Sequence, residues 1–482
     1  MTKSNAIKYL VPLFFLVVAL AVTINCGGGG GGGGSSEGTG VVRTTITDPP
    51  ICQAPAGPFE KVWVTITRVR AHISDDASPD GGGWVDLVDL RDEPRQIDLL
   101  SLATTTCILT ELGTSGELPV GKYQQIRLYL LSNDPDAGEA TPLTNECGVG
   151  QGYNCVELEG GSIQMLLLSS QAQTGIKIPP GQIEGGGLTV TADQVVDLNI
   201  DFDACSSIVL LGNGGYRLKP TLRAGEVSIN NGAITGRVVE QGTTTPIANA
   251  IVLLERRDLI DTNIDRVISQ RLTGPDGTFV LCALSTGIYD VVVAAKTVSG
   301  AVTKTYNATV TLDVPLGTGV TNMGDIPLTP EPGTSLPATI SGSVSTSGAS
   351  QLDATESDVV LTALQPVSAG ALLVTVPLFN STSSSATVDT GDTVAPSSCG
   401  YGCANFSLEV PASTPRVGTY SAAPPISYVP TPGAIVYAVS AQAFKDDLAN
   451  CSDSNQIFPG IVVQPGVETT ISAIEFTGCR LP

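Results

Sequence analysis

The sequence predicts an all-β protein built from tandem β-sandwich domains, and three observations support this prediction. Glycine and proline are plentiful, with 54 and 32 residues in a chain of 482. Short segments rich in Val, Ile and Thr alternate between apolar and polar residues, and turn signals separate them. Apolar residues at helical spacing are scarce. The length is enough for about three domains.

The first element is a predicted export signal at residues 1–25. Lys3 and Lys8 form a short basic start without an acid, and the apolar run LVPLFFLVVALAVTI follows at residues 10–24. A basic start with a short apolar core is typical of a secretory signal. The run is shorter than the roughly 20 residues that a membrane-spanning helix needs. We therefore expect an exported protein.

Cys26 stands at the end of the apolar run and is followed by eight glycines. This position resembles the lipobox of bacterial lipoproteins, in which the signal is cut before a cysteine that becomes lipidated. The residues at 23–25, Thr-Ile-Asn, depart from the usual Leu, small residue, Gly or Ala. Gly27 in place of Asp implies an outer-membrane location, on its periplasmic face or at the cell surface. The alternative is an ordinary cut, or an uncut anchor, with Cys26 an incidental thiol.

Residues 26–58 are expected to be a lipid-anchored, Gly/Ser-rich tether. A Gly/Ser chain is a flexible coil, and glycine loses more backbone entropy on ordering than any other residue. We expect the folded body to begin at residue 59.

Residues 59–228 are predicted to form the first β-sandwich, of immunoglobulin-like type, because about seven alternating segments are separated by turns such as PDGGG and PVGK. The segments "VTITRVRAHI", "ELPVGKYQQIRLYL", "LNIDFDACSSIV" and "YRLKPTLRA" resemble domain-of-unknown-function family 4382 in order and spacing. The resemblance implies a β-fold and a cell-envelope setting. It implies no activity, because none is assigned to the family.

Residues 232–331 carry a spaced pattern at positions Gly236, Val238, Pro246, Ala250, Val252, Thr273, Asp276, Gly277, Phe279, Gly287 and Tyr289. This pattern resembles the carboxypeptidase regulatory-like domain, a prealbumin-like sandwich. The resemblance implies a non-catalytic accessory module with a carbohydrate-binding-like fold. Residues 338–482 are similar to a diverged copy of this module, in which "ATISGSV" echoes "AITGRVV" and a Ser/Thr-rich insertion interrupts the pattern.

The cysteines are predicted to form disulfides, because ten remain after Cys26 in an exported chain. The preferred pairs are Cys147–Cys155, Cys399–Cys403 and Cys451–Cys479. The four cysteines of the last third allow three pairings, so the alternatives stay open. The sequence has no CxxC and a single histidine, so we expect no zinc site.

The loop DDASPDGGGWVD carries Asp75, Asp76, Asp80 and Asp86. Clustered carboxylates can hold calcium, but the EF-hand pattern fails because Leu87 stands where its bidentate acid should be. The loop is either an irregular cation site or a polar hairpin tip. In "DLNIDFD", alternate acids likewise predict either a wet strand face or a cation site.

His72 is the only histidine, so a Ser-His-Asp arrangement would have to use it. A solvated loop histidine is the simpler interpretation. Aromatic residues make up only 5% of the chain. We expect Trp63 and Trp84 to pack in the hydrophobic core. Exposed tryptophans would instead favour stacking against sugar rings.

The formal net charge of −22 argues against a nucleic-acid partner. We expect a cell-envelope lipoprotein that acts as a non-catalytic binding or scaffold protein without a cofactor. Its partners would be the membrane, through the lipid, and an envelope protein or a glycan. The alternatives are a carboxylate-dependent envelope-polymer hydrolase and a purely structural spacer.

Overall fold

The computed structural model describes most of the chain after residue 37. The described residues are 38–47, 59–75, 77–102, 110–168, 174–178, 180–202, 204–210, 214–218, 222–227, 232–258, 261–284, 286–299, 302–331, 336–345, 358–367, 371–380, 384–390, 399, 402–423, 425–444 and 455–476. The predicted signal peptide, Cys26, Cys451 and Cys479 lie outside them.

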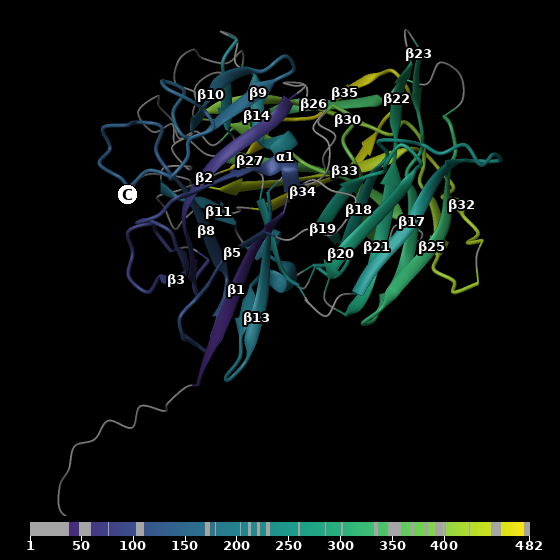
Figure 1. Ribbon diagram of the computed structural model, residues 1–482. Coiled ribbons are helices and arrows are strands. Elements are labelled where there is room, and N and C mark those ends of the chain that lie inside the picture. The colour runs from purple at the N-terminus through teal and green to yellow at the C-terminus, as the bar shows by residue number, and fades with distance from the viewer. Residues whose placement is uncertain are drawn as a thin grey trace, which may run out of the picture. The chain divides into compact units, whose positions relative to one another are not determined.

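The β13 sheet is built around strands β1 and β13, which lie side by side and parallel (Figure 1). In spatial order its strands are β16 (Leu222–Glu226), β13 (Val195–Phe202), β1 (Thr39–Thr47) and β5 (Thr110–Thr114), and β6 (Leu118–Pro119) also pairs with β1.

The prediction of a tether over residues 26–58 is wrong for residues 39–47, because these residues form strand β1. The segment TGVVRTTIT is rich in β-branched residues, which favour strands. Its alternate residues Val42 and Ile46 are completely buried. The valines and threonines after Gly40 therefore belong to the folded body.

The β2 sheet faces the β13 sheet across a shared core. Its strands are β11 (Ile176–Ile178), β8 (Gln125–Leu130), β2 (Phe59–His72), β9 (Cys155–Leu158), β10 (Ser162–Leu168), β15 (Tyr216–Leu218) and β14 (Ile208–Leu210), and β3 (Val85–Asp89) and β4 (Arg95–Asp98) also pair with β2. Smaller elements are β7 (Gly121–Tyr123), β12 (Leu188–Val190), α1 (Leu99–Leu102), α3 (Ala204–Ser207), η1 (Pro180–Gln182) and η2 (Glu184–Gly186). Residues such as Val64, Ile66 and Leu128 of the β2 sheet share one apolar cluster with Ile46 and Ile200 of the β13 sheet.

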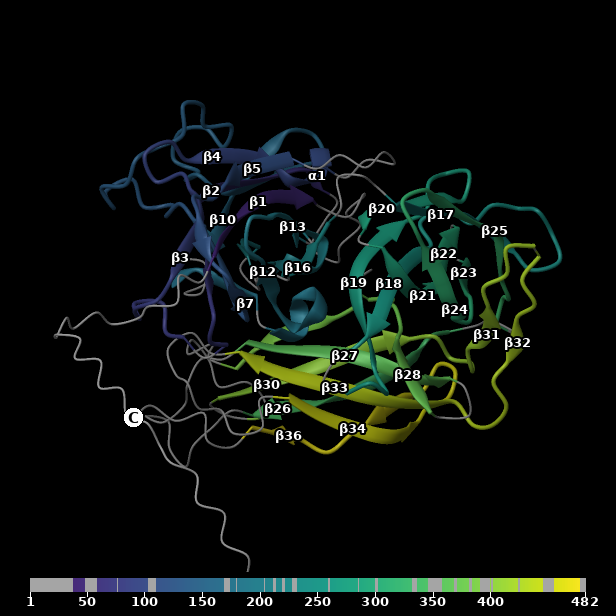
Figure 2. The same cartoon turned by 90° about the horizontal axis from the view of Figure 1, so that it is seen from below.

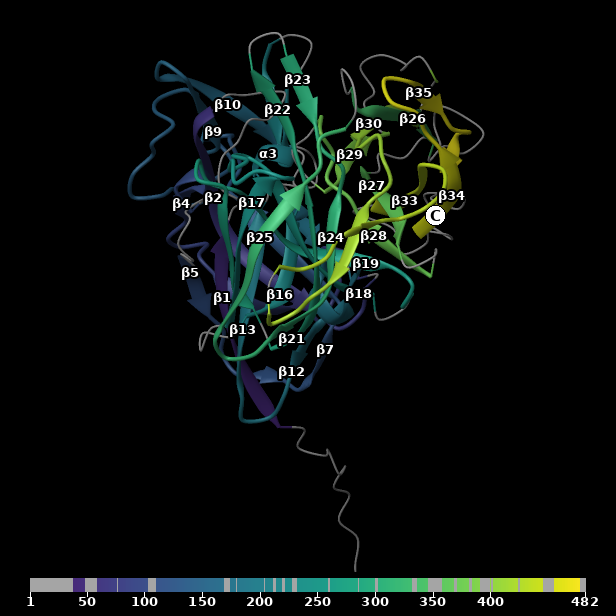
Figure 3. The same ribbon diagram turned by 90° about the vertical axis from the view of Figure 1, so that its right-hand side faces the viewer.

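The middle of the chain forms two further sheets. The β17 sheet contains β20 (Thr278–Leu284), β17 (Gly232–Glu240) and β25 (Val320–Leu328). The β21 sheet contains β19 (Asp265–Leu272), β18 (Ile251–Arg257), β21 (Gly287–Ala294), β24 (Thr309–Leu316), β31 (Arg416–Thr419) and β32 (Val429–Pro430). Strands β22 (Lys296–Ser299) and β23 (Val302–Thr305) form the hairpin labelled near the top of Figure 3.

The last part of the chain adds two sheets. The β26 sheet contains β30 (Cys403–Val410), β26 (Ala338–Ser345), β35 (Glu468–Thr470) and β36 (Ile474–Glu475). The β33 sheet contains β28 (Leu372–Thr375), β27 (Asp358–Val367), β33 (Val436–Phe444), β34 (Asn455–Val462) and β29 (Ala386–Asp389).

The β21 sheet is buried on both faces. Val252 and Leu254 of β18 pack in the core beneath the β17 sheet, whereas Ile251 and Leu253 share a core with residues of the β33 sheet such as Leu361. The continuous apolar run IVLL is typical of a strand that is covered on both sides.

The β21 sheet also takes strands from the last part of the chain. Strand β31 pairs in parallel with β24, and Figure 2 shows β31 and β32 beside it. The middle and last segments therefore share a sheet as well as a core.

The predicted all-β class is confirmed, because the described chain is built almost entirely of strands arranged in facing sheets. Among the described residues, no helix is both long enough and apolar enough to span a membrane.

A candidate anion-binding face on the β2 sheet

A β-bulge sets the direction of the charged side chains on β2. Val64 and Ile66 are buried in the core, and after the register shift between Ile66 and Arg68 the buried positions become Val69 and Ala71. A bulge adds one residue to a strand and re-aims the side chains that follow it. As a result Arg68 and the alternate residues after it point away from the core.

The strand register then places several charges in one row. Arg70 lies opposite Asp86 of β3 on one side and opposite Arg127 of β8 on the other, and Arg127 lies opposite Lys177 of β11. Directly opposed residues of antiparallel strands share one face of the sheet, with Cβ atoms about 5 Å apart. We call Arg68, Arg70, Asp86, Arg127 and Lys177 the arginine face.

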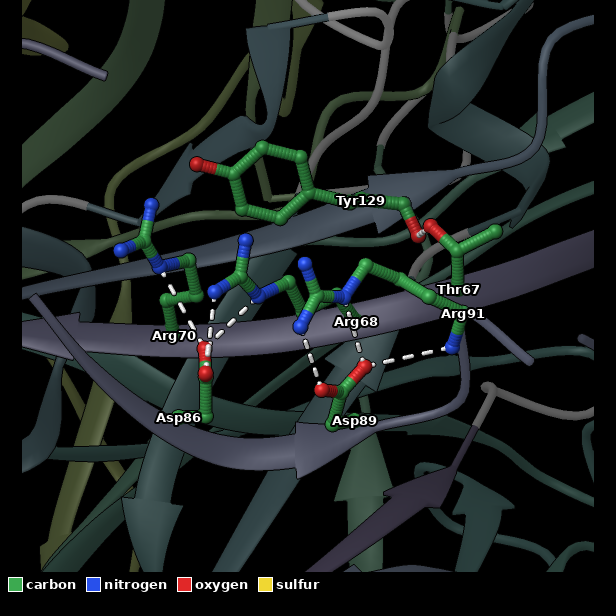
Figure 4. A network of polar contacts seen from close by, with 7 residues as sticks. All are labelled: Thr67, Arg68, Arg70, Asp86, Asp89, Arg91 and Tyr129. Carbon is green, nitrogen blue, oxygen red and sulfur yellow. Dashed lines mark hydrogen bonds and ion pairs between the residues drawn. The ribbon is translucent and has the colours of Figure 1, made fainter. Parts of the chain in front are cut away.

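Asp86 is held by two arginines of β2. Arg68 donates from Nε to Oδ1 at 2.7 Å and from Nη2 to Oδ2 at 2.9 Å, which is a bidentate pair. The Nε atom of Arg70 lies 3.4 Å from the same Oδ1 (Figure 4). The side chains of Arg68 and Arg70 are 19% and 18% exposed, so this charge cluster is largely shielded from water.

Asp86 does not take part in the predicted cation loop, because its carboxylate is already paired with two guanidinium groups. Asp75 and Asp80 are exposed loop residues, and Asp76 lies outside the described residues. Within the described part of the chain, no group of three or more His, Cys, Asp or Glu residues is placed to hold a metal ion.

Arg127 is completely buried on the outer side of the sheet. Its Nη1 donates to the carbonyl oxygen of Gly175 at 3.2 Å and to that of Thr174 at 3.3 Å. The indole of Trp84 lies close to its guanidinium, with 5.6 Å between Cζ and the ring centroid. The loop before β3 therefore covers the outer face of β8.

The side chain of Trp84 is half-buried and covers the outer face of the sheet, contrary to the expectation that it packs in the hydrophobic core. Cζ of Arg70 lies 5.3 Å from its ring centroid, within the range of a cation–π contact. Its Nε1 donates to the carbonyl oxygen of Ser78 at 2.8 Å. The indole thus links the loop to both Arg70 and Arg127.

His72 ends β2 and is also half-buried, rather than solvated in a loop. The backbone N–H of Ser74 donates to Nδ1 at 2.9 Å, and Nε2 lies 3.0 Å from the carbonyl oxygen of Gly82. The imidazole centroid is 5.2 Å from that of Trp84. These contacts give His72 a role in holding the loop.

The buried donors on this face include the hydroxyl of Tyr129 and Nε of Arg70, which have no hydrogen-bond partner within the described structure. The contact of Arg70 with Asp86 is an ion pair without hydrogen-bond geometry. Tyr129 lies opposite Arg68 on β8, and in Figure 4 its hydroxyl points to the same side as the Arg70 guanidinium. Buried donors nearly always meet an acceptor in native proteins. The two donors therefore indicate a place for an acceptor oxygen.

Beside the face, Arg91 pairs with Asp89, with 2.6 Å between Nη2 and Oδ2. The hydrogen bond from Arg91 lowers the pKa of Asp89 to about 2, and the same contact raises the pKa of Arg91. Both side chains are about half exposed, at 57% and 43%. The two opposite charges of this pair cancel, so the pair adds no net charge beside the arginine face.

The acids of β13 form neither a wet face nor a cation site. Asp197 accepts a hydrogen bond from Nε of Arg43 at 2.6 Å. Asp201 is 5% exposed and accepts a hydrogen bond from Thr47 at 3.1 Å. The parallel neighbour β1 therefore supplies a partner for each of these acids, and Nη1 of Arg271 also lies 3.8 Å from Oδ1 of Asp201. Asp203 lies outside the described residues.

A second titratable cluster lies in the β21 sheet, which sequence reasoning missed. Glu255 and Asp265 are completely buried, and Asp290 is 4% exposed. Burial raises the pKa of Glu255 well above its usual range, and burial together with Asp290 raises the pKa of Asp265 to about 9. Glu255 accepts a hydrogen bond from the backbone N–H of Thr375 at 3.0 Å, so the cluster faces the β33 sheet.

Two of the preferred cysteine pairs are joined in the structure. Cys147 and Cys155 form a disulfide with Cα atoms 5.7 Å apart, and Cys399 and Cys403 form another with Cα atoms 5.8 Å apart. The pair Cys451–Cys479 lies outside the described residues.

The N-terminal part of the body is similar to a known family. A family model described as a domain of unknown function, DUF4382, matches residues 39–220. This segment contains most of the β13 sheet and the whole β2 sheet, so the arginine face lies within the matched domain. No curated protein matches the chain.

Solved structures show only distant similarity. The Bacillus anthracis TIE protein is 10% identical with a TM-score of 0.17, and the match covers 91% of this chain and 51% of that protein, so this chain spans about half its length. GBS52, the minor pilin of Streptococcus agalactiae, is 12% identical with a TM-score of 0.19, over 52% of this chain and 97% of the pilin. The shaft pilin SpaA from Lactobacillus rhamnosus GG is 11% identical with a TM-score of 0.16, over 61% of this chain and 98% of the pilin.

Proposed function

We propose that this chain is a lipid-anchored, non-catalytic binding or scaffold protein of the cell envelope, and that it binds through the arginine face. The observation that carries the proposal is the row of opposed cations across β2, β8 and β11 in a chain with a net charge of −22. Like charges directly opposite on a sheet are destabilising. A local concentration of positive charge attracts anionic ligands and raises their rate of association.

The acidic residues with raised pKa values are buried, and their burial supports a binding role over the hydrolase alternative. A glycosidase needs two carboxyl groups that flank the bond to be cleaved. Glu255 and Asp265 have raised pKa values but no exposed surface, and their surroundings are the packed β18 and β19 strands. Their burial favours a structural role.

The lipid anchor at Cys26 is part of the proposal and has its own test. Palmitate labelling and membrane fractionation of the full chain should show label and membrane association, and both should be lost in Cys26→Ala. An unlabelled wild-type chain would contradict the lipobox interpretation.

Binding is tested with the mature Cys26→Ala chain added to isolated envelopes. Retention should be strongest at low salt, because charged contacts are screened over about 8 Å at physiological ionic strength. The double variant Arg70→Gln/Lys177→Gln should lose retention, whereas Lys61→Gln, which removes an exposed cation of the same strand, should keep it. If the protein is a spacer without a binding role, the Cys26→Ala chain, the double variant and Lys61→Gln should be retained equally.

The two later segments, at 232–331 and 338–482, are proposed as accessory modules of the carboxypeptidase regulatory-like type. Their strands provide the support for this part of the proposal, together with the sequence pattern around Gly277.

A further inference from the structure

We infer that the contact between the middle and last parts of the chain is a pH-dependent latch. It is closed while the buried carboxyl groups of Glu255, Asp265 and Asp290 hold protons, and it opens as they lose them. The latch joins strands β18 and β19 of the middle part to strand β28 of the last part (Figure 2). It lies apart from the arginine face and does not depend on the proposed binding function.

The strand register brings the three acids together. Glu255 of β18 lies directly opposite Asp290 of β21, and Arg257 of β18 lies opposite Asp265 of β19. Like charges directly opposite on a sheet are destabilising. Glu255 and Asp265 are completely buried, and Asp290 is 4% exposed. Since a charge that is buried away from water is strongly disfavoured, the closed arrangement favours the protonated acids.

The cluster is in direct contact with β28. The backbone N–H of Thr375 donates to Oε2 of Glu255 at 3.0 Å, and the Thr375 hydroxyl donates to the carbonyl oxygen of Asp265 at 3.1 Å. Near the start of the same strand, the N–H of Leu373 donates to the carbonyl oxygen of Asn263 at 2.8 Å. A charge that forms on Glu255 or Asp265 therefore forms inside the junction between the two parts.

The carboxyl oxygens of the closed junction lack the partners that an ionised acid needs. Within the described part of the chain, Oε1 of Glu255 and both side-chain oxygens of Asp265 are buried without a hydrogen-bond partner. An ionised carboxylate accepts hydrogen bonds at both oxygens. Ionisation therefore favours an open junction, in which water reaches these atoms.

The charges around the cluster come from several neighbouring strands: Arg257 of β18, Arg223 of β16 and Asp313 of β24. The side chain of Arg257 is 43% exposed and is shared between Asp265 and Asp290. Arg266 of β19 lies at the same junction and is paired with Asp258 at 3.0 Å. Strands β28 and β33 carry no charged residue. The cation that pairs with the cluster is therefore partly exposed and divided between two acids.

The direction of the pH effect follows from the proton balance. Burial, together with Asp290, raises the pKa of Asp265 to about 9, against 3.8 for an unperturbed aspartate. Between these values the closed junction binds more protons than the open one. The open population should therefore rise with pH, by up to about tenfold per pH unit for each proton released, and level off above the closed-state pKa.

The test is hydrogen–deuterium exchange of the mature Cys26→Ala chain from about pH 6 to about pH 9, read by mass spectrometry and corrected for the base-catalysed rate of free amides. A peptide covering residues 372–376 should exchange faster as the pH rises, by up to about tenfold per pH unit after the correction. Strand β25, which pairs with β17, should stay protected at the pH at which this peptide has exchanged. Exchange of both segments together would show global unfolding, and no rise at residues 372–376 would show a junction that stays closed. Either result would overturn the latch.

Two variants test the carboxyl groups themselves. Asp265→Asn and Glu255→Gln each remove an ionisable group and keep a polar side chain of similar size, and the introduced glutamine still offers an oxygen to Thr375. Each should reduce the pH dependence of exchange at residues 372–376, by up to about tenfold per pH unit. Asp80→Asn, which changes an exposed loop residue, should leave it as in wild type. A wild-type pH dependence in both cluster variants would overturn the assignment, and the wild-type comparison with β25 decides the question if a variant does not fold.

Discussion

Nη1 of Arg257 lies 3.3 Å from Oδ1 of Asp265, and the same guanidinium is shared with Asp290, whose Oδ2 is 3.5 Å from Nη2. One cation therefore faces two carboxyl groups, with Glu255 buried nearby. With its pKa raised to about 9, Asp265 retains its proton at neutral pH. Burial is the largest cause that raises the pKa of Asp265, and the neighbouring Asp290 adds to it.

Stability should fall as the pH rises from about 5 to 8. The pKa of Asp265 is about 9 in the folded chain, against 3.8 for an unperturbed aspartate, so between these values the folded state binds more protons than the unfolded state. The stabilisation is complete below the unfolded pKa and is lost as the pH rises towards the folded value. The slope is at most about 1.4 kcal/mol per pH unit for one group. Urea unfolding at several pH values measures it.

Asp265→Asn should reduce this slope and stabilise the chain at pH 8, because the amide needs no proton to remain neutral. The matched control is Asp80→Asn, which removes an exposed carboxylate elsewhere and should leave the slope unchanged. Equal slopes for wild type and Asp265→Asn would show that Asp265 is ionised in the folded state.

Gly277→Ala should destabilise the chain more than Gly242→Ala. Both glycines have positive φ, at +77° and +78°. A Cβ at Gly277 would lie 2.5 Å from the backbone oxygen of Val238, whereas among the described residues no heavy atom lies within 4 Å of one at Gly242. We expect a cost of about 1 kcal/mol at Gly242 and about 2–4 kcal/mol at Gly277 in chemical unfolding. Similar losses of stability in the two variants would mean that the positive φ, and not the close approach to Val238, determines the effect.

Reducing the disulfide Cys147–Cys155 should lower the free energy of unfolding by about 2–3 kcal/mol, since it closes a short loop. The measurement compares the Cys147→Ser/Cys155→Ser variant with wild type by thermal unfolding. Thiol alkylation followed by intact mass should show these cysteines protected until a reductant is added. Alkylation of both in the unreduced folded chain would contradict the pairing.

Tyr428→Phe should cost about 1–2 kcal/mol of stability. The Tyr428 hydroxyl lies 2.9 Å from that of Thr311, and Thr311 is completely buried. The variant keeps the ring and leaves the Thr311 hydroxyl without this partner. A stability within about 0.3 kcal/mol of wild type would show that the bond contributes nothing net.

Much of the fold could be predicted from the sequence because strand alternation and turn residues are local signals. Val62, Val64 and Ile66 are buried as their alternation requires. The pairing of β1 with β13 could not be predicted in this way, since it joins Val41 to Val195. The Gly/Ser run before Gly40 predicts a tether, and the β-branched residues that follow Gly40 were wrongly included in that prediction.

The arginine face was missed for a related reason. The segment ITRVRAH carries a break in alternation between Ile66 and Val69, and this break is the local sign of the bulge. Its consequence, however, depends on β8 and β11, which supply Arg127 and Lys177. The acidic residues of the following loop are close together in the sequence. The cations are dispersed over three strands and come together only through the pairing register of those strands.

The parallel pairing of Thr309 with Arg416 spans 107 residues, the difference between the two positions. A chain made from its N-terminus exposes the edge of β24 long before β31 exists. Until then that edge is an open template for pairing with other chains. Synthesis order therefore leaves the edge of β24 prone to aggregation in the newborn protein, and a nascent chain halted before residue 416 should need a chaperone more than the complete chain does.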